Sequence, residues 1–230
     1  MTQLVDERPT PRKNPRQARS QFTVEAILEA AARILEDEGH NAFSTNAVAR
    51  RAGFSIGSLY QYFPSKDAIV GALLQRESAL LLEGAVAALN APTARVALRI
   101  LIAASVAHQF RRPRLARLLD FEEARLPLDS YTQAVGSKMT DVACQAIAKP
   151  DVPSQRNRLQ AARDVIAITK GMIDAEGARG VHKSPTLQRR VERAVFGYLG
   201  MPLRSRPGSL EVSNSQDDAA NPTRDSDGGK

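Results

Sequence analysis

The feature that most constrains this chain is the segment STNAVARRAGFSIGSLYQYFPSK, which begins at Ser44. Ser44 or Thr45 can cap a first short helix, because both side chains accept a hydrogen bond from a free backbone N–H. Gly53 permits a tight turn, and Ser55 can cap a second short helix that ends before Pro64. Two short helices joined by a glycine-containing turn are a candidate helix-turn-helix.

One side of this segment is aliphatic and the other is polar. Ala49 is small, so the second helix can cross the first closely. An earlier helical pattern, from about Ser20 to Gly39, supplies an apolar face through Ile27 and Ile34. The predicted shared core consists of these two residues with Val48, Ala52, Phe54, Leu59 and Phe63.

The polar side carries groups that suit a DNA groove. The Ser58 hydroxyl and the Tyr60 phenol can bond phosphates or base edges, and Gln61 can read an adenine. Lys66, in the first turn of the next helix, lies beside free backbone N–H groups and can hold a phosphate. The alternative is that the tyrosines are half-buried packing residues. The candidate contacts in the second helix are Ile56, Gly57, Ser58, Tyr60, Gln61 and Tyr62.

The remainder of the chain indicates further helices and no strand, so the predicted fold class is all-α. Prolines punctuate helices expected over roughly 66–89, 93–111, 114–119, 131–148, 154–176 and 185–199. The acidic stretch DFEEARLPLD at 120–129 is interpreted as a solvated turn in preference to a metal site. The run RRPRLAR at 111–117 is placed at the junction of the two halves or on the DNA-facing side.

The net charge of +7 permits a polyanionic partner without requiring one. Residues 1–66 carry nine basic and seven acidic residues, a net charge of only +2. The electrostatic part of DNA binding must therefore come from the local distribution of these charges, because the net charge of the segment is small. The stretch from Arg8 to Thr23 and the Arg50–Arg51 pair contain no acidic residue. The single Cys144 excludes an internal disulfide, and no apolar run is long enough for a membrane span. We expect a cytoplasmic protein without a metal or cofactor.

The segments ILEAAARILEDEG at 27–39 and TNAVARRAGFSIGSLYQYFPSKDAI at 45–69, within a pattern of about nine helices, resemble the TetR family of bacterial transcription regulators. This resemblance implies a helix-turn-helix head (19–66) and a larger effector-binding and dimerisation body (67–200). Residues 1–18, rich in proline and cations, are either a solvated disordered tail or a flexible basic arm that reaches nucleic acid, and the polar residues 201–230 are expected to be a disordered tail. The resemblance adds Ser55, Thr45 and Asn46 to the candidate DNA contacts, and Arg19, at the end of the basic stretch, is a further candidate. Asn can also pair with adenine through two hydrogen bonds.

In the body, the candidate effector contacts are His108, Phe121, Met139 and Met172. An apolar stripe on the last predicted helix, with residues of the helix before it, can form a four-helix bundle across a two-fold axis. The alternative is that the stripe packs within its own subunit. The candidate dimer residues are Leu159, Ile166, Ile173, Leu187, Val191, Ala194, Val195 and Tyr198.

The predicted function is therefore a homodimeric DNA-binding regulator, a repressor of a palindromic operator that a small-molecule effector releases. Three alternatives remain: an activator, an effector-independent architectural DNA binder, and a helical-bundle enzyme with a DNA-binding appendage. The enzyme lacks support, because the sequence contains no nucleophile motif, Cys–His pairing or Gly-rich phosphate loop.

Overall fold

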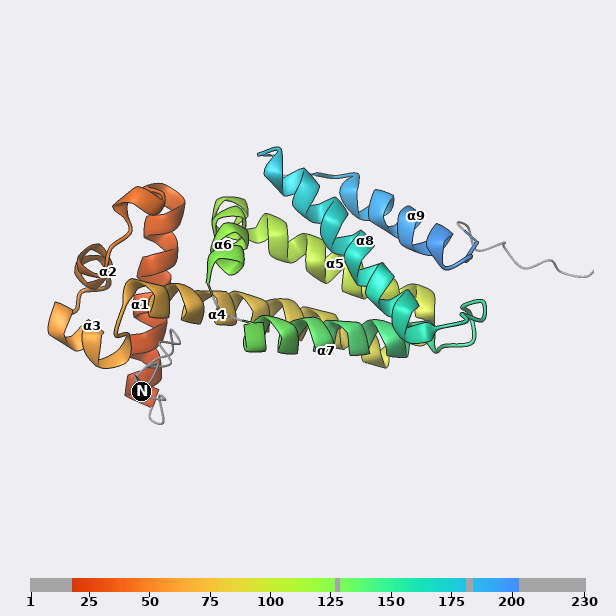
Figure 1. Ribbon diagram of the computed structural model, residues 1–230, viewed down its shortest axis with the longest axis horizontal. Helices are drawn as coiled ribbons and strands as arrows, with labels where there is room; N and C mark the ends of the chain where they lie inside the picture. Colours follow the sequence, from red (N-terminus) through yellow and green to blue (C-terminus); the bar gives the residue numbers. More distant parts are fainter. Residues whose placement is uncertain (1–17, 127–128, 181–183, 203–230) are drawn as a thin grey trace, which may run out of the picture.

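The computed structural model describes residues 18–126, 129–180 and 184–202 (Figure 1). These residues form an all-α protein without a strand, which confirms the predicted fold class. The predicted arm (1–18) and tail (201–230) lie outside the described residues except for Ala18, Met201 and Pro202. The α-helices are α1 (Ala18–Asp37), α2 (Thr45–Ala52), α3 (Ile56–Tyr62), α4 (Lys66–Val86), α5 (Ala94–Arg111), α6 (Pro113–Arg125), α7 (Asp129–Ile147), α8 (Arg158–Ala178) and α9 (Leu187–Tyr198), with short 3₁₀ helices at His40–Ala42 and Ala87–Asn90.

Serine caps and one glycine define the helix boundaries in the N-terminal part. The hydroxyls of Ser44, Ser55 and Ser65 accept hydrogen bonds from the backbone N–H groups three residues ahead, at 3.2, 3.0 and 3.1 Å. Gly53 ends α2 in the left-handed conformation, with φ of 76°, which a residue with a Cβ adopts only at a cost. The caps and turn expected from the sequence are therefore present.

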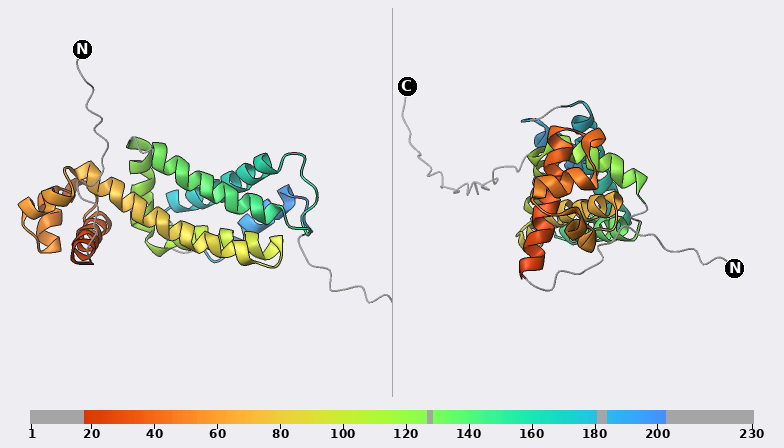
Figure 2. Two further views of the ribbon diagram at one scale, coloured as in Figure 1. Left: turned by 90° about the horizontal axis from the view of Figure 1, so that it is seen from below. Right: turned by 90° about the vertical axis from the view of Figure 1, so that its left-hand side faces the viewer.

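Two separate cores divide the molecule into a head and a body. The head core is built from α1, α2 and α3 with the first half of α4, and its centre includes Ile27, Ile34, Val48, Leu59 and Phe63. The body core is built from the second half of α4 with α5, α7, α8 and α9. Helix α4 thus passes from one core into the other, as Figures 1 and 2 show.

Helix α6 corrects the interpretation of 120–129 as a solvated turn. It continues to Arg125, and Leu115, Leu119 and Leu126 are buried in the head core. Their spacing of four and seven residues places them on one helical face, which pulls the acidic stretch into the helix. Glu122 lies on the same face and is 1% exposed. The helix therefore packs against the head although it belongs to the body in sequence.

The remaining differences between the predicted and the observed element boundaries are small. Helix α8 begins at Arg158, where Asn157 caps it through Gln160 N at 3.0 Å, rather than near Ser154. Met201 is 3% exposed and packs into the body core, so the ordered body extends past residue 200. No helix among the described residues has both the length and the apolar character needed to cross a membrane.

Candidate nucleic-acid interface and ligand cavity

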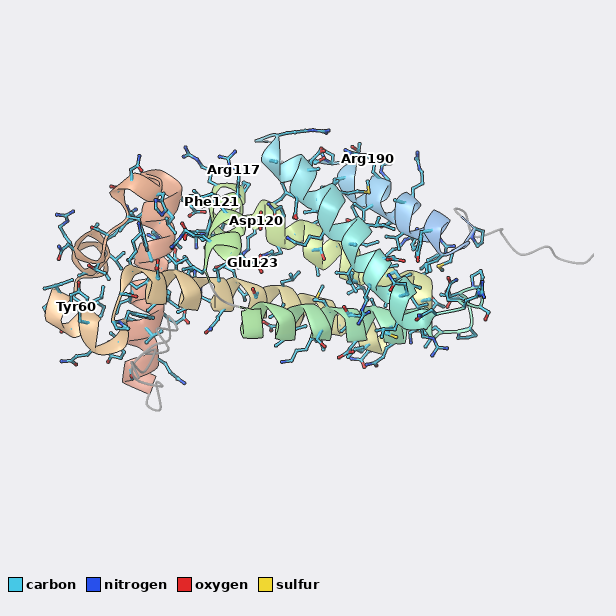
Figure 3. The ribbon with its side chains drawn as sticks, viewed as in Figure 1. Tyr60, Arg117, Asp120, Phe121, Glu123 and Arg190 are labelled. Atoms are coloured by element: carbon cyan, nitrogen blue, oxygen red, sulfur yellow. The ribbon has the colours of Figure 1, made fainter. Side chains whose placement is uncertain are left out.

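Helix α3 presents a polar face at the outer end of the head. Leu59 and Phe63 are both 0% exposed and fix the helix to the head core. On its other side Ser55, Ile56, Gly57, Tyr60 and Gln61 are exposed. Figure 3 labels Tyr60 at the end of the molecule farthest from α9. The buried side holds α3 in place while the exposed side is free for a partner.

The start of α2 adds two of the predicted contacts to this face. Asn46 is exposed, and Val48 and Ala49 bury the opposite side of the helix. The Thr45 hydroxyl lies 3.2 Å from the Tyr60 hydroxyl, in a hydrogen bond that joins α2 to α3. The two helices therefore present one continuous surface.

Some predicted contacts already have partners within the head. The Ser55 hydroxyl accepts from the Ser58 backbone N–H and lies 2.8 Å from the Ser58 hydroxyl. Tyr62 is half-buried and packs against the head core, as the packing alternative required. These groups are less available to a partner than the exposed Asn46 and Gln61.

The cations near this face differ in their surroundings. The Lys66 ammonium lies 3.3 Å from His40 Nε2 and 5.3 Å from the centre of the Phe43 ring. Arg51 contacts Asp37 at 2.6 Å and Glu38 at 3.0 Å, so it is not free of acids as the sequence suggested. Arg50 is exposed. The side chain of Arg19 lies outside the described residues.

A cavity of about 220 Å³ lies in the body between α4, α5, α6, α7 and α8. Two of the four predicted effector contacts, His108 and Met139, line it. Phe121 does not, because its side chain is 66% exposed on the far side of α6. Met172 packs against the body core but is not a lining residue. The prediction that Phe121 and Met172 contact an effector is therefore wrong for a ligand bound in this cavity.

The lining also includes residues that the sequence reasoning missed. Asp120 and Glu123 come from α6, and Lys170 and Asp174 from α8. The first two were assigned to a turn, and the spacing of Leu115, Leu119 and Leu126 is the signal that would have placed them on a helix. The complete lining is Ser78, Leu81, Ser105, His108, Gln109, Asp120, Glu123, Val135, Gly136, Met139, Ile166, Thr169, Lys170, Ile173 and Asp174.

Most of the predicted dimer residues are engaged within the subunit. Leu187, Val191 and Val195 are each 0% exposed in the body core, so they have no surface for a second subunit. Ile173 is buried, Ile166 lines the cavity, and Ala194 is partly buried. The stripe on α9 therefore packs internally, which corrects the prediction that it forms the dimer surface. Leu159 and Tyr198, each 45% exposed, remain available.

Contacts of α6 with the head form a junction close to the cavity. Arg112, at the start of α6, donates to Glu29 at 3.0 Å and to Glu36 at 2.9 Å, both on α1. At the other end, Arg125 donates to Asp67 of α4 at 2.6 Å. Of the arginine run at 111–117, Arg112 thus lies at the junction, one of the two places expected from the sequence.

A three-helix head with two capped helices across a glycine turn, and a polar exposed face on the second, defines a helix-turn-helix DNA-binding protein. Residues 27–73 match the family described as bacterial regulatory proteins, tetR family. The head therefore carries the DNA-binding domain of the TetR family of transcriptional regulators.

Relatives and solved structures agree with this assignment. The chain is 22% identical to the HTH-type transcriptional regulator UidR of Escherichia coli K12 over 201 residues, which cover 80% of this chain and 96% of UidR. It is 43% identical to the HTH-type transcriptional repressor KstR of Mycolicibacterium smegmatis over 51 residues, 22% of this chain and 25% of KstR. A TetR-family regulator from Mesorhizobium loti has the same fold, with a TM-score of 0.64, 16% identity, and coverage of 80% and 98%. Both relatives are named as regulators, not as enzymes.

Proposed function

We propose that this regulator is a repressor that binds a palindromic operator as a homodimer and leaves it when a small molecule occupies the body cavity. The observation that carries the proposal is the exposed polar face of α3 and the start of α2. The side chains on this face are uncharged and exposed. Such side chains can form hydrogen bonds with base edges in a major groove. The name of the repressor KstR, to which the chain is similar over 51 residues, supports repression.

Asn46 and Tyr60 have distinct roles in this proposal. Asn46 is exposed, and its amide can donate to and accept from an adenine. The Tyr60 hydroxyl is held by Thr45 at 3.2 Å, so it is oriented for a phosphate, a contact that positions the protein without reading sequence. Ser55, Ser58, Gln61, Ile56, Gly57, Tyr62, Thr45, Lys66 and Arg19 are proposed as the remaining contacts.

Helix α6 is the proposed link between the cavity and the head. Asp120 and Glu123 line the cavity, whereas Arg112 and Arg125 on the same helix bond to head and α4 residues. A ligand that moves α6 therefore changes how α1 and α4 are held. Since coupling between two sites is reciprocal, such a ligand must bind the DNA-free state more tightly.

The dimer would place two α3 helices in successive major grooves, about 34–36 Å apart or somewhat more. Leu159 on α8 and Tyr198 on α9 are exposed apolar groups on the outer surface of the body, and both are proposed to face the second subunit. The opposite face of α9 is buried in the body core and holds the helix in place.

The test begins with selection of bound DNA from a random pool, followed by titration of the selected palindrome and of random DNA. Asn46→Ala should cost roughly 1–3 kcal/mol on the selected site, chiefly by relaxing the preference at one base pair. Tyr60→Ala should weaken binding to both DNAs alike. Asn41→Ala, an exposed asparagine outside α2 and α3, is the matched control and should change neither.

Equal losses on selected and random DNA for Asn46→Ala would refute its role as a reader. Failure to select any palindrome, with a steep salt dependence on all DNA, would favour the architectural alternative. Reporter expression from the selected site distinguishes repression from activation.

A further inference from the structure

The body cavity has two chemically distinct ends. Its apolar end is formed by Val135, Met139, Ile166 and Ile173 from α7 and α8. At the other end a smaller cavity of about 50 Å³ continues toward α6 and the head. The residues that line both cavities are Ser78, His108, Asp120 and Glu123. A ligand that fills the apolar end therefore places its other end beside two carboxylates, both labelled on α6 in Figure 3.

Those two carboxylates share one nearby cation, Lys170, with a third acid, Asp174. The Lys170 ammonium is paired with Asp174 at 2.9 Å. Asp120 is contacted by the neutral Gln109 amide, at 3.5 Å. No hydrogen bond or ion pair is found for Glu123 among the described residues. Three acids and one lysine thus line the cavity, which leaves an excess of negative charge at the wall that α6 forms.

The nearby basic groups do not remove this excess. Arg111 contacts Glu77, and Arg112 is bonded to Glu29 and Glu36. Burial lowers the pKa of His108, so its imidazole is neutral at pH 7 and adds no positive charge. Burial likewise raises the pKa of Asp120, and the charge of the nearby Lys170 only partly offsets this effect.

Three candidate ligand classes can be compared with these groups. A carboxylate ligand would bring a further negative charge to a site that already has an excess. A metal ion lacks a ligand set, since no three acidic, His or Cys side chains in the described part of the chain converge as a metal site. A ligand with an ammonium group and a hydrocarbon part matches both ends, because a buried charge requires a partner.

We propose that the effector class is an amphipathic organic cation, with its ammonium group between Asp120 and Glu123 and its hydrocarbon part against Met139, Ile166 and Ile173. The proposal rests on the body cavity being the effector site. The Ser78 hydroxyl and the neutral His108 ring, which line the same end, can accept further hydrogen bonds from the ammonium.

The test uses three probes with one carbon chain and different head groups: octylamine, octanol and octanoate. Binding to the full-length protein is measured by calorimetry at pH 7, where the amine is cationic. Octylamine should bind most tightly and octanoate least. Asp120→Asn and Glu123→Gln should each weaken octylamine binding by about tenfold, as expected for loss of a charged hydrogen-bond partner. The affinity for octanol should change little.

Asp141→Asn, which removes an exposed carboxylate from α7 outside the cavity, is the matched control and should leave all three affinities unchanged. Circular dichroism confirms that each variant is folded. Octanoate binding as tightly as octylamine would overturn the proposal. So would unchanged octylamine affinity in both carboxylate variants, or no binding of any probe.

Operator titration with and without octylamine separates this inference from the function it rests on. If octylamine binds through Asp120 and Glu123 but leaves operator affinity unchanged, the cation site stands and release by the cavity ligand is refuted. If octanoate releases the operator and octylamine does not, release stands and the cation inference is refuted.

Discussion

The DNA-facing surface and the body cavity place their polar groups in opposite settings. On α3 and the start of α2, the exposed Asn46, Tyr60 and Gln61 are uncharged and need no partner to remain folded. In the cavity, the carboxyl groups of Asp120 and Glu123 are partly buried, and Asp120 is contacted by the neutral amide of Gln109. The uncharged groups on α3 and α2 are well solvated in the absence of DNA. The carboxyl groups in the cavity, in contrast, would be stabilised by a ligand of opposite charge.

Helix α6 belongs to both settings, and this explains its composition. Its leucines are buried in the head core, and its arginines hold α1 and α4. Its acids on the remaining face line the cavity. The proposed coupling of the two regions rests on this helix, because it packs into the head core with one face and lines the cavity with another.

The largest expected effect is loss of the support behind the DNA-facing surface. Leu59→Ala should destabilise the head by about 2–5 kcal/mol, because it empties a fully buried site, and should abolish operator binding. Ile56→Ala, on the same helix but 37% exposed, should cost much less stability while still weakening operator binding. Chemical denaturation and DNA titration measure both. Similar stability losses in the two variants would show that α3 is not anchored on one side.

The next largest effect tests the junction. Arg112→Ala should cost about 1.5–3 kcal/mol, since it removes charged hydrogen bonds to two glutamates of α1. Arg33→Ala, which removes an exposed pair with the same Glu29, should cost only about 0.3–0.5 kcal/mol. Denaturation midpoints of the two variants give the comparison. Equal costs would mean that α6 is held by its leucines alone.

The Arg112 effect should also depend on pH. Burial raises the pKa of Glu29, but hydrogen bonds from Arg33 and Arg112 outweigh it and hold the pKa below the ordinary value of 4.5. The stabilisation is therefore complete above pH 4.5 and is lost as the pH falls through the lower native pKa. The difference between wild type and Arg112→Ala should shrink in that acidic range. A difference that is constant down to the acid transition would contradict the ionic origin.

The head could be predicted from the sequence because its determinants are local. Ser44, Gly53, Ser55 and Ser65 specify helix ends through contacts only a few residues away, and each was found where expected. The aliphatic side of α3 likewise follows from the spacing of Leu59 and Phe63. Local spacing therefore fixed which side of the segment faces outward.

The cavity could not be predicted in this way because five helices supply its walls. No spacing rule brings Ser78 of α4 near Asp120 of α6 and Lys170 of α8. The same limit explains the error on α9: an apolar stripe predicts burial, but not whether its partner is the same chain or another. The pairing of Arg51 with Asp37 and Glu38 was missed for the same reason, since those residues are distant in sequence.

A smaller effect separates folding from recognition on α3 itself. A Cβ at Gly57 would meet no atom closer than the Ser55 hydroxyl, at 4.0 Å, so Gly57→Ala should stabilise the helix by about 0.5–1 kcal/mol. Operator binding should nevertheless weaken, because the methyl group keeps DNA from the backbone. Gly53→Ala, at φ of 76°, should instead cost about 1–2 kcal/mol. Unchanged operator affinity in Gly57→Ala would show that close backbone approach is unnecessary there.

The smallest effect concerns the uncompensated charge in the cavity. Burial raises the pKa of Asp120 above its ordinary 3.8, so the native state binds this proton more tightly than the unfolded chain does. The charged form therefore destabilises the protein at neutral pH, and this penalty disappears as the pH falls through the native pKa toward 3.8. Asp120→Asn should raise the melting temperature at pH 7 and match wild type near pH 3.5, whereas Asp141→Asn should show no such trend. Octylamine should reverse the order at pH 7, because it stabilises wild type more than the variant. If the variant is no more stable than wild type at any pH, the cavity already compensates this carboxylate and gives a cation no reason to bind.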